Sequence, residues 1–253
     1  MILTPENYYS PEANLEYFST SQIKTFMDCP ARAMAELRGD YVRAETSALL
    51  IGSYVDAYFE GTLGRFMKEH PEVFKRDGSL KAEFQHANKM IERAEADRVF
   101  MEHMQGEKQV IRTGEIDGYP FKIKIDVLHP ERIVDLKTCR SLNAVYKEGE
   151  GKLTFAEAYG YTLQMAIYRE IEGHSLPAYL ACITKETPPD ICVIEIPSEV
   201  MNAELEVLKQ NLPLYDAIKQ GVVPEERCGK CEYCRSTKKL SGPISLYELD
   251  GGW

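Results

Sequence analysis

The sequence predicts an α/β fold in which a small mixed central sheet is flanked by helices and preceded by an N-terminal helical region. Helical patterns dominate residues 20–104, strand patterns follow over residues 110–138, and residues 154–220 read as helix, two strands and helix. The chain has 253 residues, of which 44% are hydrophobic and 28% are charged, as is typical of globular proteins. A chain of this length can bury a large core without disulfide bonds.

The N-terminal region contains three predicted helices. Ser19 and Gln22 match a capping box, which predicts a helix over residues 20–38. A second helix begins near Ala44 and carries the segment IGSYVDAYFEG. A third spans roughly residues 80–104, where Ala, Glu, Lys and Arg are frequent and neither Pro nor Gly occurs.

Strand patterns begin after these helices. The pair Asp117-Gly118 lies between two β-branched stretches and is typical of a hairpin turn. In the following FKIKIDVL, apolar residues alternate with Lys122, Lys124 and Asp126, so a strand places these three polar side chains on one face. After a short turn, the segment RIVDLKT predicts the next strand.

The C-terminal half completes the sheet and adds two helices. Thr154 and Glu157 cap a predicted helix that ends at Gly173. The segments AYLACITK and DICVIEI predict two further strands, and Ser198 begins a helix that runs to about residue 220. Together with the preceding hairpin, these strands predict a sheet of mixed strand direction.

The chain shows no internal repeat, low-complexity stretch or linker rich in Pro, Gly and Ser. The sequence therefore predicts one continuous domain over residues 1–227 and a Cys-rich basic tail, residues 228–253, that packs on the same domain. No apolar run approaches the length of a membrane span, and the N-terminus lacks the basic and apolar regions of a secretory signal. We therefore expect a cytoplasmic protein without a membrane partner.

The overall charge gives no general attraction to nucleic acid. The net charge of −10 comes from 30 basic and 40 acidic residues. Residues 227–239 differ from the rest, because five basic residues there oppose only Glu232, which leaves a local charge of +4. Such a patch suits contacts with a phosphate backbone, although a solvated basic tail has the same composition.

Two carboxylates and a lysine form the clearest candidate site. On a strand, Asp135 and Lys137 leave the same face, while Leu136 enters the core. Asp126 lies nine residues before Asp135, so pairing of the two strands across a tight turn brings the carboxylates together. Converging carboxylates suit Mg²⁺ or Mn²⁺, and a neighbouring lysine can activate water and offset charge on a phosphate. For this motif alone, a solvated hairpin with ordinary surface charges is the alternative.

Further polar residues extend this candidate site. Lys122 and Lys124 lie on the same strand face as Asp126, where they can contact a phosphate backbone. Gln164 and Tyr168 are four residues apart, so they share one face of the predicted helix. Taken alone, such a pair is typical of a helix face that packs on another element.

The order of these motifs carries more information than any one of them. Gly52 and Asp56 form G-x-x-V-D, and D, D-L-K-T and Q-x-x-x-Y follow in turn. This order resembles the PD-(D/E)XK nucleases of the helicase-nuclease and phage-exonuclease branch, and FSTSQIKTFMDCPARAMAELRG is similar to the N-terminal helix of that branch. The resemblance is strongest to phage exonuclease VIII-like proteins, covers about residues 8–240 and implies a restriction-endonuclease-like core.

The resemblance assigns roles to the residues that match its motifs. By this resemblance, Asp126 and Asp135 are metal-binding acids and Lys137 is the catalytic lysine. Gln164 and Tyr168 match the pair that contacts DNA and supports the site.

Asp56 departs from the family pattern, because many members of the branch have His at this position. A carboxylate also binds Mg²⁺ or Mn²⁺, so the resemblance still implies a metal ligand here. The implied activity is that of a metal-dependent exonuclease on linear double-stranded DNA ends in phage-type recombination, with a single-strand annealing protein as partner and a ring-shaped homo-oligomer. Two alternatives stay open, a catalytically silent DNA- or protein-binding module of the same fold and a structure-selective endonuclease.

Three of the seven cysteines are clustered as Cys228, Cys231 and Cys234, which favours metal or cluster ligation over disulfides in a reducing compartment. Related CRISPR-associated and helicase-nuclease proteins bind a [4Fe–4S] cluster through one N-terminal and three C-terminal cysteines, and Cys29 matches the N-terminal position. The prediction is therefore a [4Fe–4S] cluster or Zn²⁺, with a buried Cys29 that binds nothing as the alternative. The other cysteines fall in or beside predicted strands and are expected in the core: Cys139, Cys182 and Cys192.

Overall fold

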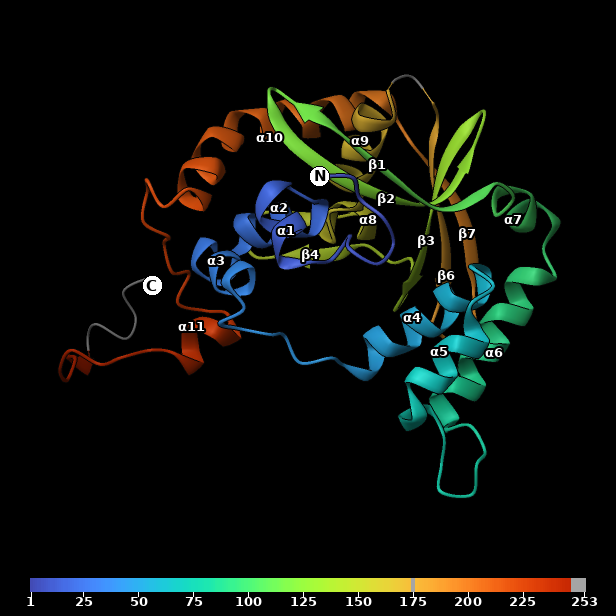
Figure 1. The fold of residues 1–253 in the computed structure, drawn as a ribbon. Helices are drawn as coiled ribbons and strands as arrows, with labels where there is room; N and C mark the ends of the chain where they lie inside the picture. The colour runs from blue at the N-terminus through green and yellow to red at the C-terminus, as the bar shows by residue number, and fades with distance from the viewer. Residues whose placement is uncertain (174–175, 247–253) are drawn as a thin grey trace. The chain divides into compact units, whose positions relative to one another are not determined.

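The computed structural model of the chain (Figure 1) describes residues 1–173 and 176–246. These residues form two compact units. The terminal unit contains Met1–Arg43, Glu115–Phe121 and the described residues from Val207 onward. The sheet unit contains Ala44–Gly114 and Lys122–Glu206. The predicted boundary between a domain of residues 1–227 and a tail of residues 228–253 remains an expectation.

The main sheet of the structure has five strands in the order β1-β2-β3-β6-β7. Its strands are β1 (Glu107–Ile116), β2 (Tyr119–His129), β3 (Arg132–Cys139), β6 (Ala178–Thr184) and β7 (Ile191–Ile196). β3 pairs antiparallel with β2 and parallel with β6, and β6 pairs antiparallel with β7. The sheet is therefore mixed, as the sequence predicts.

The hairpin between β1 and β2 forms at the predicted turn. Asp117 and Gly118 have φ values of 52° and 80°, the left-handed conformation that a tight two-residue hairpin turn requires. The alternation along β2 also agrees with the prediction, because Ile123, Ile125 and Val127 are all at most 1% exposed. This register directs Asp126 away from the apolar face.

Helices cover both faces of the sheet within the sheet unit. The helices are α4 (Ser47–Phe59), α5 (Leu63–Glu69), α6 (Ala82–Glu95), α7 (Arg98–His103), α8 (Phe155–Ala158) and α9 (Tyr161–Glu172), with a 3₁₀ turn η1 (Pro71–Val73). α4, α6 and α7 share one hydrophobic core with Val134, Leu136 and Ile183 of the sheet. α9 contacts β3 and β6, and its Gln164 binds Asp135, whose side chain leaves the opposite face.

The terminal unit is helical and joins the two ends of the chain. Its helices are α1 (Pro11–Glu16), α2 (Thr20–Asp28), α3 (Pro30–Arg38), α11 (Glu232–Ser236) and the C-terminal half of α10 (Ser198–Lys219). Aromatic contacts hold it together, since Phe26 stacks on Tyr215 at 5.4 Å and Phe18 lies 5.6 Å from Phe121. Ser19 caps α2 as predicted, but the Gln22 amide binds the carbonyl of Asn14 instead of completing a capping box.

The predicted helix over residues 20–38 is wrong in one respect, because two helices occupy it. The chain breaks at Cys29, whose φ and ψ of −167° and 101° are extended. Pro30 causes the break, since a proline disfavours the helical conformation of the residue before it. The break turns Cys29 into the junction between α2 and α3.

Two other long helices are also divided. The stretch 80–104 is interrupted before Asp97, whose side chain accepts a hydrogen bond from the Phe100 N–H and begins α7. The helix capped by Thr154 and Glu157 stops after one turn and restarts after Gly160, which has a φ of 62°.

A small second sheet, which the sequence does not predict, consists of β4 (Val145–Lys147) and β5 (Gly151–Leu153). No helix in the described ranges is long and apolar enough to span a membrane.

Candidate functional site

The predicted carboxylates and lysine come together on β2 and β3 of the sheet unit. Val127 pairs with Val134 across the two strands, and beyond this pair Oδ2 of Asp126 accepts a 2.9 Å hydrogen bond from the Leu136 N–H. On the same strand as Leu136, the ammonium of Lys137 forms an ion pair with Asp135. Asp135 is 1% exposed and Lys137 is 19% exposed, so this pair differs from ordinary surface charges.

Helix α4 brings a third carboxylate to this site. Gly52 lies against β3 so closely that a Cβ on it would be 3.1 Å from Oγ1 of Thr138. One turn later, Asp56 lines a small cavity together with Asp126, Lys108 and Gln109. The glycine of the G-x-x-V-D motif therefore allows the close approach of helix and strand that delivers its aspartate.

The charges at the site shift its titrating groups strongly. Burial, followed by the charge of Asp126, raises the pKa of Asp56 well above its usual range. Burial and the charge of Asp135 raise the pKa of Asp126 to about 7. Burial alone would lower the pKa of Lys137, but Asp135 and Asp126 outweigh it and raise that pKa above its usual value. Lys137 is therefore an ammonium at neutral pH.

The predicted glutamine and tyrosine hold one of these carboxylates. The Nε2 amide of Gln164 donates a 2.6 Å hydrogen bond to Oδ1 of Asp135 and also lies 3.1 Å from the Tyr168 hydroxyl. Both side chains on α9 are buried, at 9% and 8% exposure. The spacing of four residues thus places both on the helix face that covers the carboxylate.

The structure also shows a site residue that the sequence analysis missed. Gln109 on β1 has a φ of 54°, a left-handed conformation that is uncommon for residues other than glycine. Its Nε2 donates a 3.2 Å hydrogen bond to Oδ1 of Asp126, and its buried Oε1 has no hydrogen-bond partner in the described part of the chain. No local signal predicts this residue, because an isolated glutamine in a strand pattern carries no sign of an unusual backbone angle.

Tyr161 is a second neighbour that the sequence analysis did not single out. The Lys137 ammonium lies 5.2 Å from the centre of its ring, within the range of a cation–π contact. Tyr161 opens α9 directly after Gly160, so the division of the predicted helix places this ring beside the lysine.

The donor atoms of the site suit a hard divalent cation. Asp56, Asp126 and Asp135 supply carboxylate oxygens, and Gln109 adds a buried carbonyl oxygen without a partner in the described residues. Such a set matches Mg²⁺ or Mn²⁺. The three carboxylates do not bring their oxygens within 4.8 Å of one another in the described structure. Mg–O bonds of about 2.1 Å place ligand oxygens at most about 4.2 Å apart, so at least one carboxylate would bind the ion through a water molecule in this arrangement.

The two lysines predicted to contact DNA occupy different environments. Lys122 is 1% exposed, and its burial lowers its pKa to about 8. Lys124 is half-buried and therefore more accessible. The apolar alternation of β2 predicts the face of Lys122 but not its burial.

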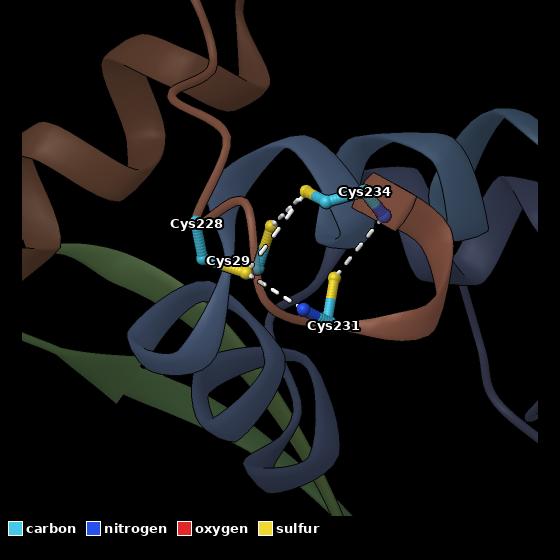
Figure 2. A group of neighbouring side chains, drawn as sticks. All are labelled: Cys29, Cys228, Cys231 and Cys234. Atoms are coloured by element: carbon cyan, nitrogen blue, oxygen red, sulfur yellow. Dashed lines mark hydrogen bonds between the residues drawn. The ribbon is translucent and has the colours of Figure 1, made fainter. Parts of the chain in front are cut away.

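Four cysteines of the terminal unit form a second cluster. Figure 2 shows the sulfur atoms of Cys29, Cys228, Cys231 and Cys234 directed toward one another, and all lie within 4.8 Å of one another. The sulfur of Cys234 is 3.5 Å from that of Cys29 and 3.9 Å from that of Cys228. The structure thus brings together the four residues that the sequence groups, including the distant Cys29.

The cluster has the electrostatics of a cation site. Burial raises the pKa of Cys228, but hydrogen bonds from the backbone of Cys231 and Lys230 outweigh this and lower it to about 6. Burial, followed by hydrogen bonds with the neighbouring cysteines, raises the pKa of Cys234 to about 12. The remaining cysteines lie elsewhere: Cys139 and Cys182 are buried, and Cys192 is half-buried.

Contacts around the cluster attach the C-terminal segment to α3 within the terminal unit. Arg38 forms a 2.8 Å ion pair with Glu225, and the Ala31 N–H donates to the carbonyl of Glu226. Tyr41 and Tyr233 have ring centres 5.3 Å apart. The predicted basic tail is therefore packed at its cysteines and not a free extension there.

Comparisons with known proteins identify the family of this chain. A family model described as a PDDEXK-like domain of unknown function (DUF3799) matches residues 19–237. The crystal structure of a protein named "Putative exonuclease" from Eubacterium rectale is 42% identical and superposes with a TM-score of 0.96, with 100% of each chain covered. No curated protein is significantly similar to the sequence. The fold is thus that of the PD-(D/E)XK nuclease superfamily with a restriction-endonuclease-like core, and the chain belongs to the family of PDDEXK-like domains DUF3799.

Proposed function

We propose that this protein is a metal-dependent deoxyribonuclease. Its catalytic residues for the hydrolysis of phosphodiester bonds would be Asp126, Asp135 and Lys137. The observation that carries this proposal is the buried ion pair of Asp135 and Lys137, held by Gln164 and placed beside Asp126. The charges of Asp126 and Asp56 interact with this pair, and a group of coupled acids around one lysine is typical of a catalytic site. Family membership and the name of the similar structure support the same activity.

Each residue has a role that follows from its environment. Asp126 and Asp135, with Asp56, would hold Mg²⁺ or Mn²⁺, which when bound supplies a Lewis acid for the phosphate and a more acidic water. Lys137 is charged at neutral pH, so it orients the attacking water and stabilises negative charge on the phosphate. A general-base role would require a lowered pKa instead.

The two glutamines orient the carboxylates of the site by hydrogen bonds. Gln164 fixes the rotamer of Asp135 through its 2.6 Å hydrogen bond. Gln109 donates a hydrogen bond to Asp126, and its buried carbonyl oxygen has no partner in the described residues. Tyr168 supports Gln164, and Lys124 contacts the phosphate backbone. Lys122 can do so only if its buried ammonium becomes exposed.

The test is degradation of linear duplex DNA with Mg²⁺, with Mn²⁺ and with a chelator. The Asp135→Asn variant should lose metal-dependent degradation while keeping its thermal unfolding temperature close to that of the wild type. Asp40→Asn is the matched control, because Asp40 is an exposed aspartate of the terminal unit. Undiminished cleavage by Asp135→Asn would contradict the proposal.

Within this activity we propose an exonuclease that resects linear double-stranded ends in phage-type recombination. The name of the 42% identical structure supports exonuclease action, and the sequence resemblance supports a single-strand annealing partner and a ring-shaped oligomer. Covalently closed circles separate this proposal from a structure-selective endonuclease, since an exonuclease leaves them intact.

A catalytically silent DNA- or protein-binding module is the second candidate. The observation in its favour is Asp56, because a third carboxylate replaces the histidine that is common in the branch and raises the repulsion at the site. DNA binding without hydrolysis in either metal would establish this alternative.

For the cysteine cluster we propose a single structural Zn²⁺. Four thiolates around one zinc ion with Zn–S bonds of about 2.3 Å lie roughly 3.8 Å apart, and the separations of 3.5 and 3.9 Å support this geometry. A [4Fe–4S] cluster places its own atoms between the cysteines and therefore needs wider spacing. The gap between Cys231 and Cys234 is also shorter than the longer last gap of the cluster-bearing relatives, which favours zinc.

A further inference from the structure

A row of aromatic rings leads away from the catalytic lysine of the sheet unit. The Tyr161 ring lies 5.2 Å from the Lys137 ammonium, and the Tyr159 ring lies 6.0 Å from that of Tyr161, tilted by 35°. Tyr161 is half-buried, but Tyr159 is 51% exposed. Tyr159, two positions before Tyr161, therefore presents an aromatic ring to solvent next to the ring that contacts the lysine.

The small β4–β5 sheet adds a second exposed ring in this region. Both strands contact α8, whose C-terminal cap is Tyr159. Tyr146 on β4 pairs with Lys152 on β5 and is 80% exposed, among the highest values of any large apolar side chain in the described structure. Single exposed apolar residues are common, but Tyr159 is connected through Tyr161 to Lys137, so its exposed ring can receive a ligand with flat faces near the candidate site.

Charge does not provide affinity for nucleic acid in this part of the chain. Residues 140–161 contain three basic and three acidic residues, and the whole chain carries a net charge of −10. This segment itself therefore supplies little attraction to phosphates, and a DNA strand bound on it would need another attraction. Stacking of bases on aromatic rings is such an attraction, and it is insensitive to base sequence.

We propose that Tyr159, with Tyr146 beyond it, forms a stacking surface for unpaired bases of the DNA strand that reaches Lys137. The proposal rests on the nuclease function above and names the form of its substrate: the nucleotides next to the scissile phosphate are unpaired when they bind. Stacking on Tyr159 would keep the end of the strand in line with the carboxylates.

The test is equilibrium binding of a fluorescein-labelled oligothymidylate, measured by fluorescence anisotropy in the presence of chelator so that no cleavage occurs. Loss of one stacked base weakens binding by about 1–3 kcal/mol, which corresponds to roughly 5- to 150-fold in Kd. We expect this loss in Tyr159→Ala and a loss of the same kind in Tyr146→Ala. Tyr159→Phe should bind like the wild type, because it retains the ring.

Tyr9→Ala is the matched control. Tyr9 is 66% exposed and packs edge-on against Tyr8 in the terminal unit, so its loss removes an exposed tyrosine ring remote in sequence from the site. Its Kd should equal that of the wild type. The thermal unfolding temperature of each variant shows whether the fold is retained.

Three outcomes would overturn the stacking surface: no binding of the oligonucleotide by the wild type, unchanged binding by Tyr159→Ala, or equal losses in Tyr159→Ala and Tyr159→Phe. The last outcome would assign the effect to the hydroxyl. Failure of the nuclease function is detected in a separate assay, because cleavage of linear duplex DNA by the wild-type protein in the presence of metal does not involve the tyrosine variants. Ring-dependent binding without any cleavage would retain the surface and reject the nuclease.

Discussion

The side-chain amide of Gln164 donates a hydrogen bond of 2.6 Å to the carboxylate of Asp135, 29 residues earlier in the chain. Both side chains are buried, so water cannot replace this bond if it is lost. A helix that covers the sheet thereby determines the orientation of a carboxylate that the sheet presents.

Gln164→Ala should lower the rate of DNA cleavage by about 10- to 100-fold, the usual effect of losing a residue that orients a metal ligand. It should also destabilise the fold by about 1–3 kcal/mol, because Oδ1 of Asp135 loses its donor. Tyr168→Phe is the matched variant, since it removes the hydroxyl next to Gln164 but leaves the bond to Asp135. Equal rates for Gln164→Ala and the wild type would show that Asp135 needs no such support.

Gly52→Ala should weaken Mg²⁺ binding by displacing α4 and its Asp56, so that cleavage requires a higher Mg²⁺ concentration. The added Cβ would lie 3.1 Å from Oγ1 of Thr138, so helix or strand must move by a few tenths of an ångström. Gly64→Ala on α5 is the control, because nothing lies within 4 Å of its Cβ. The double variant with Thr138→Ala removes the crowding atom and should recover the Mg²⁺ affinity; additive effects in this pair would contradict the packing explanation.

The raised pKa of Asp126 predicts a pH-dependent stability of the metal-free protein. The folded chain keeps a proton on Asp126 up to about pH 7, whereas the unfolded chain releases it near pH 4. The free energy of unfolding should therefore fall with rising pH between these values, by at most about 1.4 kcal/mol per pH unit, relative to Asp126→Asn. Urea unfolding of both proteins in chelator, at several pH values, measures this difference. A difference that is constant from pH 4 to 7 would exclude a raised pKa.

Removal of the metal from the cysteine cluster should destabilise the terminal unit before it affects the carboxylate site. We expect one zinc per chain by elemental analysis, and its loss in Cys29→Ser with a fall in Tm of at least about 5 °C, or roughly 2 kcal/mol. Cys192→Ser is the control, because Cys192 is half-buried and outside the cluster. Brown protein containing iron and sulfide after anaerobic purification would replace zinc by an iron–sulfur cluster.

The sequence predicts those parts of the fold and site in which the pattern itself carries the physical cause. Alternation along β2 and the Asp117-Gly118 turn determine which face presents Asp126, and a spacing of four places Gln164 and Tyr168 together. The order of the motifs along the chain then predicts that Asp56 belongs to the same site as the carboxylates of the hairpin. These features depend on local geometry and on the order of elements, both of which a sequence contains.

Other features depend on contacts that no local pattern encodes. The left-handed backbone of Gln109 and the burial of Lys122 arise from tertiary packing, so composition and periodicity give no sign of them. The divided helices were predictable in part, because Pro30 directly follows the break at Cys29 and Gly160 lies between α8 and α9. A prediction from helix propensity alone gives one long helix in each of these regions, whereas Pro30 and Gly160 divide each region into two helices.

The meeting of Cys29 with Cys234 across 205 residues has a consequence for synthesis of the chain. At about 5–20 residues per second, a ribosome delivers Cys234 roughly 10–40 s after Cys29. All residues of the sheet unit have been synthesised by Glu206, so this unit can fold while α2 and α3 still lack their C-terminal neighbours. During that interval the apolar side of α3 and the Cys29 thiol are accessible to chaperones and oxidants. They become buried only when the segment that contains Cys228 and Cys234 packs against them.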